Sequence, residues 1–368
     1  MRKIWKVAWR LAVCLLLLAW IFQAIFYNEG RLEWSELNPG KDWHALTRKE
    51  RFDIAWLYGP TRLWETFKLM KAWALALSVV LMGMTIFLGV VRWQMVLRVH
   101  GLQMPLWRIT QISLVAHFFN SFLLGSVGGD LLKAYYVARE THHKKTEAVI
   151  TVFVDRILGL FSMLVFACVM MIPNLDLLTY NYRLRMLVWL ILAMTAGCAM
   201  FLVVSFWGGV SKSVPGARKW LRKLPKGEMI ERSLEAFREF GKDKTFLFRM
   251  LPIWTICNIV LVLHFLSLTW GFGLDLSPLA LSAIVPMVTS ISALPITPSG
   301  LGVRENLYVW MLAAPGIDTP AAQALLLSLV GYAGSLLWSL IGGVVYLTLR
   351  DREHLKEIAA EGPPTSFN

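Results

Sequence analysis

Two short stretches of the sequence place glycines beside paired charges in an otherwise apolar chain. The first, LLGSVGGDLLKAYY at residues 123–136, contains Gly128, Gly129, Asp130 and Lys133. Glycines allow backbone N–H groups to approach a ligand closely, and the N-terminus of a helix attracts anions. Lys133 would add a full positive charge one turn into a helix that restarts near Asp130. The stretch therefore predicts a site that binds an anionic group.

The second stretch, LPITPSGLGVRENLY at residues 294–308, repeats this combination of helix breakers and charges. Its candidate site residues are Pro295, Ser299, Gly300, Gly302, Arg304 and Glu305. We expect Arg304 to supply positive charge as Lys133 does. Asp130 and Glu305 would pair with these bases or cap the restarting helices. The alternative is that each break only ends a helix at the membrane interface, with Lys133 extending to lipid head groups.

A third pair of charges, Asp155 and Arg156 in the sequence VFVDRILG, enters an apolar stretch together. Ionisable residues within a membrane span are candidates for function. A structural ion pair at the cytoplasmic end of the span is an equally good interpretation. Asn120, which precedes the first break, completes the set of candidate substrate-binding residues.

The composition of the chain indicates that a membrane surrounds these residues. The 368 residues are 57% hydrophobic and 17% charged, and the mean hydropathy is +0.55. These values are typical of an integral membrane protein, so we predict an all-α polytopic fold. Charge-free stretches, most of them near the ~20 residues of a membrane span, lie at residues 11–28, 72–91, 109–129, 157–175, 186–211, 250–274, 276–303 and 319–349.

The distribution of charge orients these stretches. Basic residues gather at the N-terminus and, without an acidic residue, in the connection of residues 92–108, which begins at Arg92. By the positive-inside rule both segments are cytoplasmic, and the nearly neutral loop of residues 29–71 is external. Basic residues flank 109–129 on both sides, so this stretch is predicted to enter and leave on the same side. We expect a multi-pass protein of a bacterial-type inner membrane, with both termini cytoplasmic.

Residues 276–303 contain too many prolines and glycines for one continuous helix. We therefore predict a second re-entrant or broken element here, in addition to 109–129, and about six full spans. The spans and both broken elements would form a single transmembrane domain of residues 1–350, followed by a cytoplasmic polar tail of residues 351–368.

An internal repeat relates the two broken elements. A shift of 173 residues places Ser126 on Ser299, Gly129 on Gly302 and Tyr135 on Tyr308. The same shift carries the elements of residues 72–175 onto those of residues 245–349, and the charge distribution orients the two members of each pair in opposite directions. Secondary transporters with such inverted repeats bind their substrate at the repeat interface, between interrupted helices.

Other features predict neither nucleic-acid binding nor a cofactor. Loop orientation and attraction to anionic lipids account for the net charge of +13. The four cysteines lie in apolar stretches without paired spacing, and His142 and His143 lack further ligands nearby, so no metal site is predicted. His117 and His264 are expected to have packing roles.

A basic amphipathic segment at residues 212–246 favours a helix on the anionic inner leaflet. The competing interpretation is a docking site for a cytoplasmic partner, such as a lipid-processing enzyme or glycosyltransferase. The sequence leaves the oligomeric state open.

With these motifs in place, residues 5–350 resemble the family of lysylphosphatidylglycerol synthase transmembrane regions, a group of flippase-like membrane proteins. The resemblance rests on residues 120–140, on VDRILG at residues 154–159, and on residues 294–317. The chain departs from the usual family pattern conservatively: aspartate replaces glutamate at positions 130 and 155, lysine replaces arginine at position 133, and Leu124-Gly125 replaces Pro-Gly. The full synthases carry a soluble aminoacyltransferase domain after the membrane region, and no such domain is present in these 368 residues.

The resemblance implies translocation of a lipid between leaflets, with an anionic phospholipid or a polyprenyl-phosphate-linked lipid as substrate. The chain would then be a transporter and not an enzyme, with membrane lipids as its partners. Two alternatives stand beside this hypothesis. One is an intramembrane lipid-modifying transferase that uses Asp130 or Glu305 as a base. The other is an accessory subunit of a lipid glycosyltransferase, docked through residues 216–245.

Overall fold

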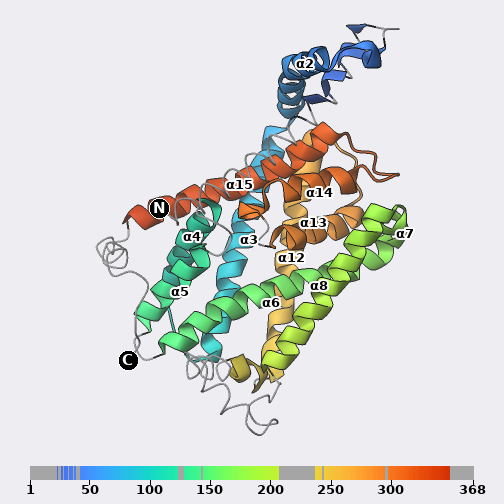
Figure 1. Ribbon diagram of the computed structural model, residues 1–368. Helices are drawn as coiled ribbons and strands as arrows, with labels where there is room; N and C mark the ends of the chain where they lie inside the picture. Colours follow the sequence, from blue (N-terminus) through green and yellow to red (C-terminus); the bar gives the residue numbers. More distant parts are fainter. Residues whose placement is uncertain are drawn as a thin grey trace.

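The computed structural model describes residues 42–122, 128–141, 144–206, 237–242, 244–294 and 297–348, with scattered positions between residues 23 and 38. Several predicted features lie outside the described residues: most of the span at residues 11–28, Leu124-Gly125, His142 and His143, most of the segment at residues 212–246, Pro295 and the tail at residues 351–368. Every regular element in the described residues is a helix (Figure 1).

The prediction of an all-α polytopic membrane protein is confirmed. Within the described residues, five helices are long and apolar enough to cross a membrane. They are α3 (Ala72–Val99), α6 (Lys145–Met171), α8 (Tyr182–Phe206), α12 (Lys244–Phe272) and α15 (Ala321–Thr348). A short 3-10 turn, Ile172–Asn174, and helix α7 (Leu175–Thr179) extend α6 towards α8.

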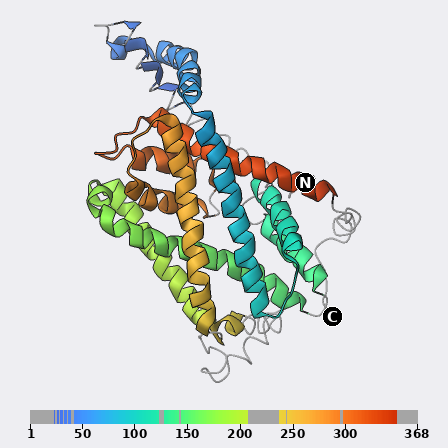
Figure 2. The same cartoon turned by 180° about the vertical axis from the view of Figure 1, so that it is seen from behind.

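Helices α3 and α12 lie side by side and run in opposite directions (Figure 2). The Lys71 N–H, just before α3, donates a hydrogen bond of 3.0 Å to the carbonyl of Gly271, near the end of α12. A Cβ at Gly271 would lie 2.4 Å from the Met70 sulfur, so glycine permits the close approach of the end of α12 to the start of α3.

Helices α4 (Leu106–Phe122) and α5 (Gly128–Glu140) form the first helical hairpin. Arg108, near the start of α4, pairs with Glu140 at the end of α5. At the other end, the Gly129 N–H donates a hydrogen bond of 2.8 Å to the Asn120 side chain. The two helices are therefore antiparallel.

Helices α13 (Pro278–Ser292) and α14 (Val303–Leu312) form the second helical hairpin, with a 3-10 turn at Pro298–Gly300 between them. Gly300 has a φ of +69°, and a Cβ on it would lie 2.8 Å from the backbone oxygen of Ser292. Both the backbone angle and the lack of space require glycine at this turn.

Two apolar clusters support the two hairpins separately. One cluster surrounds α13 and α14 with residues of α6, α8, α12 and α15. The other packs α4 and α5 against α3 and the first half of α6, around the buried Trp93. Each hairpin is thus held by its own well-packed core.

Two predicted helix boundaries differ from the structure. Arg92 does not lie in a connection, because α3 continues to Val99 and Arg92 is inside it. Helix α6 begins at Lys145, so Asp155 and Arg156 lie inside the helix and not in its first turn. Arg92, Asp155 and Arg156 have charged partners within the protein, whereas a search for charge-free stretches ends the span at the first charge.

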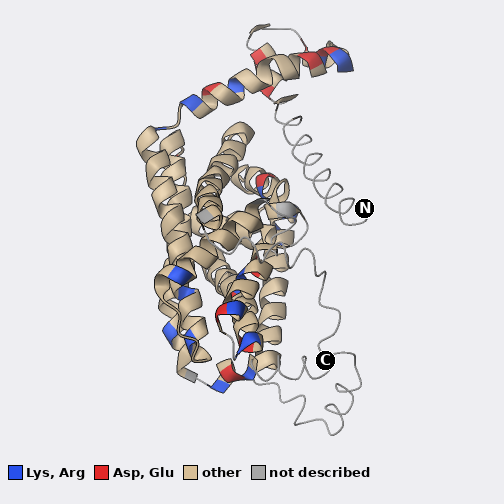
Figure 3. Ribbon diagram, turned by 90° about the vertical axis from the view of Figure 1, so that its left-hand side faces the viewer, with Lys and Arg blue, Asp and Glu red and all other residues tan. Residues whose placement is uncertain are grey.

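The loop expected at residues 29–71 contains helix α2 (Arg48–Lys68). Thr47 and Glu50 form a capping box at its start, which satisfies backbone N–H groups that have no partner within the helix. Figure 3 shows charged residues on α2 and at the opposite end of the bundle, with a mostly apolar region between them.

Candidate functional site

Asn120 joins the end of α4 to the start of α5 in the first hairpin. Its side-chain oxygen accepts the hydrogen bond from the Gly129 N–H, and its amide donates a bond of 3.4 Å to Asp130. Asp130 also pairs with Arg156 of α6. A Cβ at Gly129 would lie 1.9 Å from the carbonyl oxygen of Ala116, so only glycine fits at this position.

A buried carboxylate, Asp155, lies between two cations. Arg92 donates to both of its oxygens, at 2.8 and 3.3 Å, and Lys133 donates to one of them at 3.4 Å. The Asp155 side chain is only 6% exposed. The Lys133 ammonium also lies 3.9 Å from the centre of the Trp93 ring, where the face of the ring attracts a cation.

Arg92 fits against α6 because of a glycine. A Cβ at Gly159 would lie 2.7 Å from the Arg92 guanidinium. The sequence VDRILG therefore supplies both the carboxylate that pairs with Arg92 and the glycine that leaves space for the Arg92 guanidinium. Sequence reasoning missed Arg92 and Trp93, because their partners are distant along the chain and leave no local pattern.

Asp155 and Arg156 are adjacent in sequence but take different partners. Asp155 pairs with Arg92 and Lys133, and Arg156 pairs with Asp130. These five side chains form the first charged group. Counting only these described side chains, three cations against two carboxylates give one net positive formal charge.

The second hairpin carries Glu305, which is fully buried. One of its oxygens accepts a hydrogen bond of 2.6 Å from the Gly302 N–H, which caps α14. The other accepts from Arg304 and from the Ser328 hydroxyl. Glu305 therefore caps a helix and pairs with a base at the same time.

Arg304 is held on three sides. It donates to Glu305, donates a bond of 3.1 Å to Ser328, and lies 4.2 Å from the centre of the Tyr332 ring. Arg304 and Glu305 are the second charged group, in which the two charges balance.

The two hairpins meet at their turns. The Ser299 hydroxyl donates a hydrogen bond of 3.3 Å to the backbone carbonyl of Asn120. Ser299 has a φ of +54°, which is uncommon outside glycine, and Gly302 has a φ of +85°. A strained turn of one hairpin is thus in contact with the residue that organises the turn of the other.

Two histidines form hydrogen bonds between elements: His117 joins the first hairpin to a span, and His264 joins two spans. His117 of α4 lies 3.2 Å from both the carbonyl and the hydroxyl of Ser335 in α15. His264 of α12 donates from Nδ1 to the carbonyl of Ser78 in α3, at 2.9 Å. Both side chains have the packing role that a single histidine in an apolar segment suggests.

The arrangement suits the binding of an anion better than acid–base chemistry. Asp130, Asp155 and Glu305 each accept hydrogen bonds from cationic side chains. Each of these carboxylates is therefore already engaged by a cation within the protein. The cations, by contrast, can exchange a carboxylate for the oxygens of a phosphate.

Comparison with known proteins places the chain in a family. A family model described as the lysylphosphatidylglycerol synthase transmembrane region matches residues 53–345. A protein of Methanothermobacter thermautotrophicus, described as a UPF0104 membrane protein, is 23% identical over 288 residues, covering 73% of this chain and 83% of that relative. Because the match spans both hairpins and both charged groups, the chain belongs to the family of lysylphosphatidylglycerol synthase transmembrane regions.

Proposed function

We propose that the protein translocates an anionic lipid across the membrane, with the lipid head group held where the two hairpin turns meet. The observation that carries this proposal is the contact between Ser299 and Asn120, beside a charged group with one net positive charge. Interrupted helices that meet in this way form the substrate site of many secondary transporters.

The net charge of the first group matters because an anion is costly inside a bilayer. A bare charge at the centre of the hydrocarbon core costs at least ~2.5 kcal/mol. Arg156 is the most accessible cation of the group, with 37% of its side chain exposed, and Lys133 is 12% exposed. Arg156 can bind two phosphate oxygens with its guanidinium, while Lys133 adds a point charge.

Transport would then require the two turns to separate. The contact between Ser299 and Asn120 is a single hydrogen bond between uncharged groups, and such a bond contributes only about 1 kcal/mol. Each hairpin has its own apolar cluster, and α15 packs against both α4 and α14, so we expect the hairpin ends to part by a shift against α15 and not by unfolding of either element. Alternating exposure of the first charged group to the two sides would complete the cycle.

The test is lipid movement in liposomes. The purified protein is reconstituted with a fluorescent phospholipid or polyprenyl-phosphate analogue in one leaflet, and its appearance in the other leaflet is followed. Lys133→Ala would remove the net positive charge of the first group, and Glu305→Ala would leave Arg304 buried without its carboxylate. We expect both substitutions to reduce transport to the rate of protein-free liposomes.

Two controls make the result specific. Lys242→Ala removes a cation that is 70% exposed and pairs with Glu239, outside both charged groups, so its transport rate should equal that of the wild type. Glu305→Gln keeps an oxygen for the Gly302 N–H and separates loss of the cap from loss of the charge. Wild-type rates in both alanine variants would exclude the assignment. A chemically modified lipid in the recovered membranes would favour the transferase instead.

A further inference from the structure

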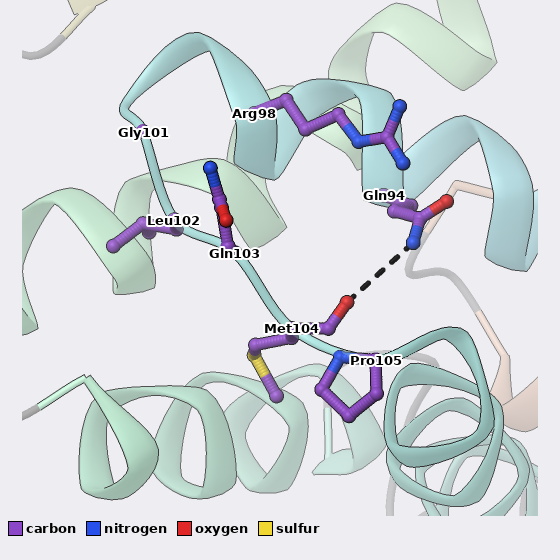
Figure 4. Close-up of a pocket in the computed structure, with 7 residues that line it drawn as sticks. All are labelled: Gln94, Arg98, Gly101, Leu102, Gln103, Met104 and Pro105. Carbon is purple, nitrogen blue, oxygen red and sulfur yellow. Dashed lines mark hydrogen bonds between the residues drawn. The ribbon is translucent and has the colours of Figure 1, made fainter.

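A polar hollow lies at the corner between α3 and α4, apart from both charged groups. Its volume is about 660 Å³. One wall is the last part of α3, with Gln94 and Arg98, and the other is the connection of residues 101–105 (Figure 4). Gln94 and Arg98 are four residues apart on a helix, so their side chains lie on the same face.

The walls of the hollow present hydrogen-bond donors. The Gln94 amide lies 3.5 Å from the carbonyl of Met104 and joins the two walls, as the dashed line in Figure 4 shows. Gln103 adds a second amide from the connection. At the rim, the Lys144 ammonium donates a bond of 2.8 Å to the carbonyl of His100 and lies 3.8 Å from the Cβ position of Gly101.

Arg98 differs from three other arginines of this half of the molecule. Arg92, Arg108 and Arg156 each pair with a carboxylate. Arg98 is exposed, and within the described part of the chain it has no acidic partner. Its guanidinium is therefore available for an anion at the hollow.

The depth of Arg98 indicates the source of such an anion. Helix α3 has 28 residues and, at about 1.5 Å per residue, is about 42 Å long. The apolar core of a bilayer is about 30 Å thick, so α3 is long enough for its last turn, which carries the exposed Arg98, to reach the head-group layer. Trp107, just beyond the hollow, is 63% exposed, as is common for tryptophan at the membrane interface.

We propose that this hollow binds the phosphate group of an anionic phospholipid from the adjacent leaflet. Arg98 contacts the phosphate oxygens through two N–H groups, the amides of Gln94 and Gln103 bind the remaining polar groups of the head group, and Lys144 adds positive charge at the rim. This site is separate from the substrate site proposed above, and it exists whether or not the protein transports lipid.

Binding of phosphatidylglycerol to the purified full chain, measured by native mass spectrometry during lipid titration, tests the proposal. We expect Arg98→Gln to weaken the affinity about tenfold or more, because charged hydrogen bonds are lost. Arg98→Lys should weaken it several-fold, because lysine keeps the charge but cannot bind two oxygens in the planar geometry of arginine. Gln94→Leu, which leaves every charge in place, should also weaken it.

The matched control is Arg249→Gln. Arg249 is an exposed arginine near the start of α12, at the same end of the bundle as Arg98, but it does not line the hollow. Its replacement should leave the affinity unchanged, and thermal unfolding of every variant checks that the fold is intact.

Equal affinities in the wild type, Arg98→Gln and Arg249→Gln would overturn the proposal. Full affinity in Arg98→Lys and Gln94→Leu would also overturn it, because Arg98 would then only extend its charge into the head-group layer. Competition with inorganic phosphate and glycerol phosphate separates the two sources of a phosphate: displacement of the lipid at micromolar concentration would identify a soluble ligand and exclude the lipid. Because binding alone is measured, failure here is distinct from failure of the transport assay.

Discussion

At the scale of single residues, Asp155 organises the first charged group, since it pairs with both Arg92 and Lys133. Its importance could be predicted from sequence, because a carboxylate within an apolar stretch needs a partner. The identity of the partner could not. Arg92 lies 63 residues earlier in the chain, and such a long-range pair has no local pattern.

Asp155→Asn should be strongly destabilising. Removing one member of a buried ion pair leaves an uncompensated charge, which typically costs about 3 to 5 kcal/mol. Thermal unfolding in detergent, measured for Asp155→Asn, Arg92→Gln and the double variant, gives the coupling between the two side chains. We expect the double variant to be more stable than the sum of the single effects. Simple additivity would show that the pair contributes nothing through its charges.

At the scale of elements, glycine and its neighbours place the turns of the hairpins. The helix breaks near Gly129 and before Gly302 could be predicted, because helix-breaking glycines and prolines cluster there beside charged residues. Helix ends such as Val99 and Lys145 could not, since Arg92 in α3 and Asp155 and Arg156 in α6 find their partners only in the folded protein. Helix α2 was missed because its many charges are typical of a loop as well as of an exposed helix.

Gly129→Ala should separate α4 from α5, since a Cβ there would lie 1.9 Å from the backbone of Ala116. Backbone atoms cannot give way as a flexible side chain does, so we expect a loss of stability of at least ~1 to 3 kcal/mol from overpacking. The control is Gly197→Ala in α8, where a Cβ would meet nothing within 4 Å. Here alanine should be neutral or slightly stabilising, because it favours the helix. Equal melting temperatures of the two variants would contradict the close contact.

At the scale of the whole molecule, two hairpins approach each other within a frame of long helices. The shift of 173 residues that relates the two motifs also carries each end of α3 to within one residue of the corresponding end of α12. These two helices are antiparallel, as the opposite orientation of the halves requires. The inverted repeat and the direction of each element in the membrane stay predictions.

Labelling of single cysteines with a membrane-impermeant maleimide tests both the orientation and the re-entrant path. We expect Gln103→Cys, before α4, and Lys145→Cys, at the start of α6, to react from the same side, because α4 and α5 return the chain to where it entered. Lys49→Cys on α2 should react only from the other side, since α3 crosses between them. If Lys145→Cys reacted from the same side as Lys49→Cys, the first hairpin would cross the membrane.

The single net positive charge of the first charged group has an electrical consequence. A lipid with one negative charge would be neutral while bound, yet its charge would still move through the membrane field as it changes sides, because the group stays on α3, α5 and α6. A potential of 100 mV contributes about 2.3 kcal/mol to moving one elementary charge across the membrane. An interior-negative voltage would therefore drive an anionic lipid outward and oppose its return, and dissipating that voltage would slow net export without altering binding.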